Sequence, residues 1–417
     1  MKTVNIASIG CGRRGSAVIK LFASVKGAHV SAVCDLNKDR ADKVADEIRD
    51  EYKTERPAVY TDYEEMFKSG IDAVLIATSW ETHIPLSIEA MKHGIIALSE
   101  VCGSRSLDAC FELVKTYEET KTPIMLLENC CYGKDELLAT ALMRNGLFGT
   151  VVHCDGEYGH DIRDGLTNRK DINHYRLQNY LNYCCENYPT HELGPIAKLL
   201  GINRGNRMVS LVSVASKEAG FTEYVRAHED DLPHLKGRKF AQGDIITTLI
   251  RCANGETIRI CLDTSHPRHY NRSFTVRGTK GLYEQGCNMV YLDGMKEEFD
   301  TVETYRMNMD NGKQYEDKYL CDIWKNITKE EMENGHGGMD FLMCSDVVKR
   351  IREGRELPID VYDMASWMAV TALSEKSISE GGTLQEFPDF THGEWKNRPV
   401  EDVTELPKVM LDNMPDA

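Results

Sequence analysis

From residue 3 to about residue 150, short apolar runs alternate with amphipathic stretches. The runs have the length of buried strands, and the stretches between them repeat apolar positions with the period of a helix. This alternation predicts βαβ units around a parallel sheet, the α/β, doubly wound Rossmann architecture. The expected strands are residues 4–9, 30–34, 58–60, 73–77, 95–99 and 124–127, and the expected helices are residues 16–25, 39–52, 85–93 and 107–120.

After residue 150 the pattern changes to longer strands in which apolar and polar residues alternate. Asn254-Gly255 joins two of them, and this pair is a strong hairpin signal. We therefore expect an NAD-binding Rossmann domain over residues 1–148 and an α+β domain with an open, mainly antiparallel sheet over residues 149–417. The expected strands of the second domain are residues 151–158, 209–214, 245–252, 257–263, 273–277 and 289–292, and two late helices, residues 338–353 and 361–379, are expected to pack back on the sheet or the first domain.

The first expected strand runs into the sequence IASIGCGRRG, which spaces three glycines as Gly10-x-Gly12-x-x-Gly15. Gly10 permits a tight turn, Gly12 leaves room for a pyrophosphate, and Gly15 lets the next helix pack closely on the strand. The N-terminus of that helix offers free N–H groups to the phosphates. Strand, glycines and helix in this order predict a dinucleotide-binding site.

Asp35 stands twenty residues after Gly15, at the end of the second expected strand. A carboxylate there can accept both ribose hydroxyls of NAD and would repel the additional phosphate of NADP. The predicted cofactor is therefore NAD, although Arg13 and Arg14 could hold a 2′-phosphate and leave NADP open.

Composition narrows the partners without changing the fold. The chain of 417 residues is long enough for two domains, and a formal charge of −16 argues against nucleic acid or an anionic membrane as a partner. No apolar run is long enough to span a membrane, and the strand beginning at Val4 leaves no room for a signal peptide, so we expect a cytoplasmic protein. The 14 cysteines include no C-x-x-C pair, so we expect reduced thiols and no metal site.

Three loops follow strands of the first domain at the edge where open α/β sheets bind ligands. In residues 78–83, Trp80 could cover the nicotinamide side of the cofactor and His83 could contact a phosphate or ribose; alternatively, this segment caps a helix and Trp80 packs in the core. Glu100 could bond the nicotinamide ribose. Asn129 could bond ribose or carboxamide, or it could be an ordinary turn residue.

The densest polar cluster of the second domain is ENYPTHELGP, residues 186–195. We expect a helix to start near Pro189, with Tyr188 and His191 on the same side of its first turn. Histidine titrates near neutral pH and tyrosine can donate or relay a proton, so the pair suits acid/base work on a hydroxyl. The alternative is a histidine with a structural role.

Three further residues carry weaker signals. Tyr158 and Tyr270 could line a sugar-sized pocket, and they could equally pack on sheet edges. His336 could reach the pocket, but a helix start capped by polar side chains is the favoured interpretation of its segment.

These motifs together resemble a known family. The glycine fingerprint, the acidic residue after the second strand, the glutamate after the fifth strand and the open antiparallel sheet are similar to those of the glucose-fructose oxidoreductase, inositol dehydrogenase and MocA group (Gfo/Idh/MocA). More narrowly, the chain resembles glycoside hydrolase family 109, the NAD-dependent α-N-acetylgalactosaminidases, from about Asn5 to Lys396. The segments that carry this likeness are TSWETH, LSEV, LLENCCYG, EYGHDIR, ENYPTHELGP, HGGMDF and FPDFTHGEWK.

The residues after Glu100 separate two chemistries within that group. Its sugar dehydrogenases usually have Glu-Lys-Pro here, and the lysine assists proton removal, whereas this chain has Glu100-Val101-Cys102. The valine matches the glycosidase family, and Tyr188 or His191 has to serve in place of the lysine. The resemblance implies that tightly held NAD+ takes hydride from C3 of the sugar, the C2 proton becomes removable, the aglycone leaves C1, water adds, and the hydride returns.

The resemblance also assigns residues by matching position. Those implied to contact NAD, besides the three glycines, are Arg13, Arg14, Asp35, Trp80, Glu81, Thr82, His83, Glu100, Val101, Asn129 and Tyr188. Those implied to surround the sugar are Tyr158, Arg176, Tyr188, Pro189, Thr190, His191 and Tyr270. The chain departs from the family at residues 184–186, at Glu192, which replaces a glycine, and in the loop of residues 160–180, so the sugar and its linkage stay open.

We therefore expect a glycosidase for an α-N-acetylgalactosaminide or a related glycoside, with Tyr158, Tyr188 and His191 as the catalytic residues. Exposed antiparallel sheets commonly pair in this group, so a homo-oligomer is expected by analogy. Two alternatives remain: an NAD-dependent sugar or inositol dehydrogenase, and an NAD-binding sensor without catalysis.

Overall fold

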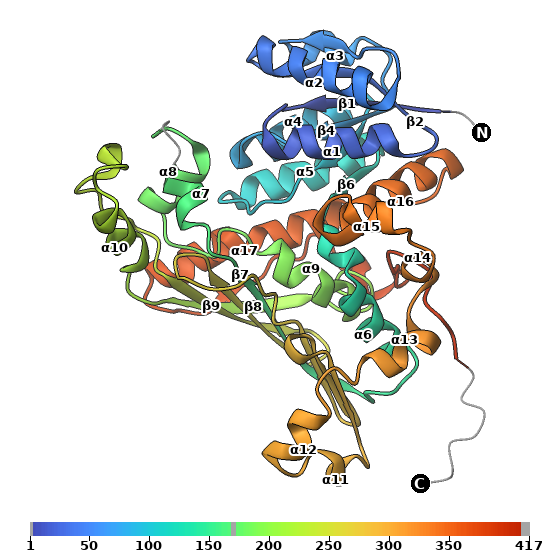
Figure 1. Cartoon of the computed structure of the whole chain (residues 1–417), viewed down its shortest axis with the longest axis vertical. Coiled ribbons are helices and arrows are strands. Elements are labelled where there is room, and N and C mark those ends of the chain that lie inside the picture. The colour runs from blue at the N-terminus through green and yellow to red at the C-terminus, as the bar shows by residue number, and fades with distance from the viewer. Residues whose placement is uncertain (1–2, 168–171, 410–417) are drawn as a thin grey trace.

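A computed structural model describes residues 3–167 and 172–409, which form two sheets connected by helices (Figure 1). The first sheet has six parallel strands in the order β3-β2-β1-β4-β5-β6, so the strand order reverses between β1 and β4. Its strands are β1 (Val4–Ile9), β2 (Ala28–Cys34), β3 (Ala58–Tyr60), β4 (Ala73–Ile76), β5 (Ile96–Ser99) and β6 (Ile124–Leu126). Its helices are α1 (Arg13–Ser24), α2 (Lys38–Tyr52), α3 (Tyr63–Phe67), α4 (Trp80–Lys92) and α5 (Leu107–Thr120).

The predicted Rossmann architecture is confirmed, and two of its helices begin at least three residues earlier than predicted. α1 starts at Arg13, directly after the second glycine, and α4 starts at Trp80 and contains Pro85. The carbonyl of Ser79 accepts both the N–H and the hydroxyl of Thr82, so the first turn of α4 forms ahead of the proline. Residues 80–83 therefore lie on a helix N-terminus at the edge where the strand order reverses, which is the usual ligand edge of such sheets.

The second sheet is mainly antiparallel, as predicted, and has eight strands in the order β13-β12-β11-β7-β10-β9-β8-β14. Only β7 and β10 run parallel among these neighbours. The strands are β7 (Val151–Gly159), β8 (Met208–Ala215), β9 (Ile245–Cys252), β10 (Thr257–Asp263), β11 (Thr275–Gly278), β12 (Gly281–Glu284), β13 (Met289–Leu292) and β14 (Gln385–Glu386). The Asn-Gly turn joins β9 to β10 as expected, whereas the short strands β12 and β14 were not predicted.

Helices fill the space between and around the two sheets (Figure 1). They are η1 (Asn129–Tyr132), α6 (Lys134–Arg144), α7 (Arg163–Thr167), α8 (Tyr175–Asn182), α9 (Thr190–Leu199), α10 (Gly220–Ala227), η2 (Pro233–Leu235), η3 (Gln285–Cys287), α11 (Lys296–Phe299), α12 (Val302–Met307), α13 (Lys313–Tyr319), α14 (Asp322–Lys325), α15 (Lys329–Glu333), η4 (His336–Gly338), α16 (Met339–Glu353), α17 (Val361–Ser379) and η5 (Glu394–Lys396). Among the described residues, no helix combines the length and apolar character that crossing a membrane requires.

Two late helices pack on the first sheet, and one of them also packs on the second. α17 packs against β8 of the second sheet and also against α5 and β6 of the first, and its Trp367 is fully buried. α16 packs against α1, β1 and η1. Both helices therefore return to the first sheet, where α16 packs on the elements that follow β1 and β6, and α17 connects this sheet to the second.

Two glycines allow α9 to press against its neighbours. A Cβ atom on Gly156 of β7 would lie 2.6 Å from the carbonyl oxygen of Glu192. A Cβ atom on Gly194 of α9 would lie 2.8 Å from Cγ of Glu128 at the end of β6. Since a real side chain cannot approach so closely, these glycines bring the first turn of α9 next to both sheets.

Candidate active site

The loop between β1 and α1 has room for a dinucleotide phosphate. A Cβ atom on Gly10 would come 2.4 Å from the carbonyl oxygen of Ala77, and one on Gly15 would come 1.9 Å from that of Gly10. On Gly12, in contrast, a Cβ atom would meet no atom within 4 Å. Gly12 is also the N-cap of α1 and offers no side chain to the first N–H groups. Close packing thus explains two glycines, and open access to a helix N-terminus explains the third.

Asp35 at the end of β2 is tied to the same loop. Its Oδ2 accepts the N–H of Cys11 at 2.8 Å, and its Oδ1 accepts the N–H of Asn37 at 2.9 Å. Nη1 of Arg40 lies 3.3 Å from Oδ2. The carboxylate is therefore fixed beside the phosphate loop, and each oxygen keeps acceptor capacity for a ribose hydroxyl.

Arg14 links the glycine loop to a late helix. Its Nε donates to Oε1 of Glu100 at 3.0 Å, and its Nη1 donates to Oδ2 of Asp340 on α16 at 2.6 Å. Nδ2 of Asn129 donates to the other oxygen of Asp340 at 2.7 Å. Although burial opposes ionisation, hydrogen bonds from His336 and Arg14 hold the pKa of Asp340 far below its usual range. Arg14 and Asn129, both predicted to contact the cofactor, thus meet at a carboxylate that the sequence had not singled out, and Glu100 joins them through Arg14.

Aromatic side chains connect the first sheet to the second. The ring of Trp80 on α4 lies 5.4 Å from that of Tyr175 and 5.5 Å from that of Tyr188, measured between centroids. The guanidinium of Arg176 lies 5.1 Å from the Trp80 ring and 5.0 Å from the Tyr188 ring. Nε and Nη2 of Arg176 are buried, and no acceptor from the described residues reaches them. Buried donors of this kind usually have a partner, so they point to a polar ligand beside Tyr188.

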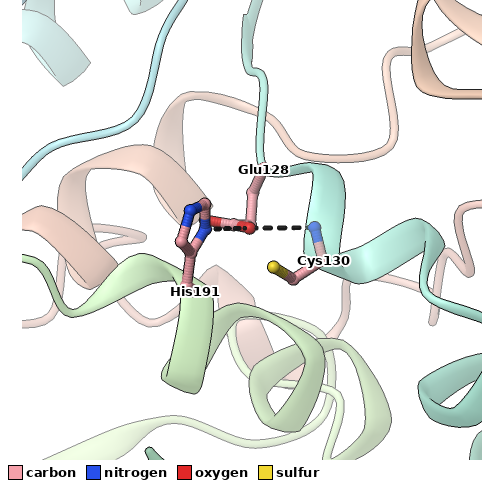
Figure 2. A group of neighbouring side chains, drawn as sticks. All are labelled: Glu128, Cys130 and His191. Carbon is pink, nitrogen blue, oxygen red and sulfur yellow. Dashed lines mark hydrogen bonds and ion pairs between the residues drawn. The ribbon is translucent and has the colours of Figure 1, made fainter. Parts of the chain in front are cut away.

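His191 forms a pair with Glu128 (Figure 2). Nδ1 of His191 lies 2.7 Å from Oε1 of Glu128, and the same oxygen accepts the N–H of Cys130 at 3.0 Å. Glu128 is fully buried. Although burial opposes ionisation, the charge and hydrogen bond of His191, together with the N–H of Cys130, lower the pKa of Glu128. An ionised Glu128 accepts a proton from Nδ1 of His191, and in the neutral ring this tautomer leaves Nε2 as the basic nitrogen.

The thiol of Cys130 completes a group of possible metal ligands. The ligand atoms of Glu128, Cys130 and His191 lie within 4.8 Å of one another. In this arrangement, however, two N–H groups already occupy one oxygen of Glu128. Burial also raises the pKa of the Cys130 thiol well above its usual value. The group as it stands is therefore arranged to hold a proton.

Tyr158 lies at the end of β7 next to the histidine. Its ring centroid is 4.8 Å from that of Tyr188 and 5.4 Å from that of His191, and its hydroxyl lies 3.1 Å from Nδ1 of His160. Burial raises the pKa of both Tyr158 and Tyr188. Both hydroxyls therefore keep their protons at neutral pH and act as hydrogen-bond donors. Tyr270 is nearly half exposed, with its ring 6.4 Å from that of Tyr158.

The prediction that Tyr188 lies on the first turn of a helix was wrong. Pro189 is the N-cap of α9, which begins at Thr190. The residue before a proline avoids the helical region, so Tyr188 stays outside the helix. Its ring still lies 5.0 Å from that of His191, because the chain bends between them.

The remaining predicted residues divide between exposed and buried positions. Arg13 and Glu81 are exposed on the first turns of α1 and α4, and Val101 is buried. His83 is buried, and its Nε2 lies 3.2 Å from the carbonyl oxygen of Thr78. Burial lowers the pKa of His83 to about 4, so its ring is neutral. In the loop of residues 160–180, which differs from the family, residues 168–171 lie outside the described part of the chain.

Comparison with known families identifies both halves of this arrangement. The model of the oxidoreductase family with an NAD-binding Rossmann fold matches residues 4–127, and the model of the glycosyl hydrolase 109 C-terminal domain matches residues 132–397. The chain belongs to glycosyl hydrolase family 109. It is 35% identical to a glycosyl hydrolase family 109 protein of Solibacter usitatus, over 95% of this chain and 90% of that protein. It is also 35% identical to an alpha-N-acetylgalactosaminidase of Tannerella forsythia, over 94% and 86% of the two chains.

Solved structures with the same fold are more distant from this family 109 member. Levoglucosan dehydrogenase in complex with NADH and levoglucosan has a TM-score of 0.67 at 17% identity, with 93% of this chain and 100% of that chain covered. The apo scyllo-inositol dehydrogenase of Lactobacillus casei has a TM-score of 0.65 at 13% identity, with coverages of 92% and 98%. At these identities the likeness establishes the fold alone.

Proposed function

We propose that this family 109 member is an NAD-dependent glycosidase for an α-N-acetylgalactosaminide or a related glycoside. The observation that carries the proposal is the pair of Glu128 and His191 at the junction of the two sheets. The imidazole ring of His191 contacts the rings of Tyr158 and Tyr188. A relative that matches nearly the whole chain is named an alpha-N-acetylgalactosaminidase, which supports the substrate class.

The glycine loop and its surroundings fit NAD. The open side of Gly12 and the uncapped N-terminus of α1 suit the pyrophosphate, and the fixed carboxylate of Asp35 suits the ribose. Trp80 lies next to Tyr188, and we assign it to the nicotinamide side of the cofactor. Bound NAD+ would supply a reversible hydride acceptor, so that C3 of the sugar can be a ketone while the bond at C1 is cleaved.

The residues of the chain supply the proton chemistry. With Nδ1 bonded to Glu128, His191 presents Nε2 as a base, and we assign to it the proton on C2 of the sugar, which a neighbouring carbonyl makes acidic. Tyr158 and Tyr188 keep their protons and donate hydrogen bonds to sugar oxygens. The orphaned donors of Arg176 bind a further polar group of the substrate. This chemistry needs no two carboxylates flanking the glycosidic bond.

A panel of α- and β-nitrophenyl glycosides, incubated in D2O with the NAD+-loaded protein, tests the proposal. We expect release of nitrophenol from one N-acetylhexosaminide, together with deuterium at C2 of the sugar product and no net gain of NADH absorbance. Steady accumulation of NADH with a free polyol would instead establish a dehydrogenase. Binding of NAD+ without turnover of any substrate would establish a sensor.

We also propose that the open face of the second sheet binds a second copy of the chain. Val212 and Leu249 face each other on β8 and β9, with Val214 next to them, while alternate residues of these strands turn towards α17. Leu249 and Val214 are each 53% exposed. Neighbouring apolar side chains on an open sheet face favour a homo-oligomer.

A further inference from the structure

Two buried carboxyl groups lie behind the site tyrosines. Glu186 stands in the segment before α9 and Glu192 on its first turn, and both side chains have at most 1% of their surface exposed. Oε2 of Glu192 accepts the N–H of Tyr158 at 3.1 Å and that of Cys261 on β10 at 2.8 Å. Oε1 of Glu186 accepts the N–H of Tyr188 at 3.3 Å. Each carboxyl group thus holds the backbone of one of the two tyrosines.

The two carboxyl groups have only each other as further partners among the described residues. They lie close enough for each to affect the pKa of the other, and no arginine, lysine or histidine of the described chain pairs with either. Glu186 Oε2 and Glu192 Oε1 receive no hydrogen bond from any described group. Two adjacent buried carboxylates without a cation would repel each other, so at least one proton is held by the pair.

Among the described residues, the groups that face the pair bring no positive charge to it. β7 and β10 contribute Tyr158 and the thiol of Cys261, and the segment before α9 contributes Tyr188 and the thiol of Cys185. α17 contributes the hydroxyl of Ser374, which accepts the N–H of Glu186. Burial, and for Glu192 also the neighbouring Glu186, raises the pKa of both groups, that of Glu186 to about 8.

We propose that Glu186 and Glu192 form a proton-sharing carboxyl pair that positions Tyr158 and Tyr188 for the sugar. This inference rests on the proposed function, because it gives these tyrosines their task. The pair joins β7 to the segment before α9 through two backbone N–H groups, and the tyrosine rings lie 4.8 Å apart. Loss of the shared proton leaves two adjacent charges in a buried site, which separates the carboxylates and with them the tyrosines. The pair therefore makes the site sensitive to alkaline pH.

Substitutions at Glu192 distinguish a shared proton from a simple packing role. Glu192→Ala leaves the N–H groups of Tyr158 and Cys261 without an acceptor, so kcat/KM falls by about tenfold or more. Glu192→Gln recovers most of that loss, because its oxygen accepts the same two N–H groups while its NH2 donates permanently to Glu186. In this variant the alkaline fall of kcat moves up by at least about one pH unit, since no titrating proton remains between the groups. Glu375→Gln, on α17 and paired with Arg105, is the matched control.

Infrared spectroscopy of the wild type tests the pair without any turnover. A protonated carboxyl band at neutral pH, lost in the variant with both Glu186→Gln and Glu192→Gln, is the expected result and stands even if no glycoside is cleaved. Absence of this band, or an unchanged alkaline limb in Glu192→Gln, overturns the proposal. Stabilisation of the wild type by Na+, K+ or Ca2+ that disappears in Glu192→Gln would also overturn it, because a cation would then occupy the pair.

Discussion

Removal of the charge on Glu128 tests the assignment of His191 as the base. Oε1 of Glu128 accepts hydrogen bonds from His191 at 2.7 Å and from the N–H of Cys130 at 3.0 Å, in a position without solvent exposure. In Glu128→Gln, the side-chain amide oxygen replaces the carboxylate oxygen as acceptor for the N–H of Cys130 and for Nδ1 of His191. His191 therefore retains the same tautomer but loses a charged partner. In Glu128→Ala, both donors lose their acceptor.

The size of both effects follows from the bonds that are lost. A hydrogen bond to a charged group contributes about 1.5–3 kcal/mol, and about 1.4 kcal/mol corresponds to a tenfold change in rate. We therefore expect kcat/KM to fall by about tenfold in Glu128→Gln and by roughly 100-fold in Glu128→Ala. Most of the loss should appear in kcat, because the pair acts on the base and not on substrate binding.

Steady-state hydrolysis of the best nitrophenyl glycoside measures both parameters, with bound NAD+ quantified in each preparation. Asp346→Asn is the control. This carboxylate on α16 accepts hydrogen bonds from the hydroxyl of Tyr132 and from Nε of Arg350, and it has no contact with His191. The control should change stability and leave kcat within about twofold. If Glu128→Ala stays within about threefold of the wild type while folded and loaded with NAD+, the assignment of His191 is refuted.

Three further predictions concern the cofactor, the assembly and stability. Gly12→Val places a side chain in open space at a negative φ, so the melting temperature should hold while NAD+ affinity, measured by calorimetry, falls by at least about tenfold; unchanged affinity would remove the glycine loop from the cofactor site. Leu249→Glu should lower the mass found by light scattering, and an unchanged mass would contradict pairing through this sheet face. The pKa of Glu186 is raised from 4.5 to about 8 on folding, so its stabilising proton is fully held below pH 4.5 and is lost towards pH 8. The free energy of unfolding in urea should accordingly fall by at least about 1.4 kcal/mol per pH unit in that window, and the slope should flatten in the variant with both Glu186→Gln and Glu192→Gln.

Features that depend on neighbouring residues could be predicted from the sequence. The three glycines, Asp35 and the Asn254-Gly255 hairpin each act through local backbone geometry, and the structure has them where the spacing indicated. The short strand β14 had no local sequence signal, because its two residues form a strand only by pairing with β8. Local pattern cannot reveal an element that one tertiary contact creates.

The contacts of the candidate site were out of reach for the same reason. Glu128 and His191 are 63 positions apart, and Arg14 and Asp340 are 326 apart. Glu128 did carry a signal, since it follows β6 at the ligand edge of the sheet, but its neighbour Asn129 received the functional role. Glu192 was noted only as a departure from a family motif. Its role became visible once the fold brought its carboxyl group to Glu186.

Of three buried carboxyl groups near His191, one is ionised and the other two retain a proton. This difference in protonation determines the role of each group in the site. Glu128 is ionised because His191 and a backbone N–H bond to it, and its charge fixes the imidazole proton on Nδ1. Glu186 and Glu192 have no basic partner among the described residues, so they retain a proton and bind backbone N–H groups instead. Exchange of these states would protonate the base at Nε2 and separate the tyrosines. A basic side chain pairs with Glu128, whereas none of the described residues brings one to Glu186 or Glu192. This difference determines which carboxyl group prepares the base and which hold the donors in place.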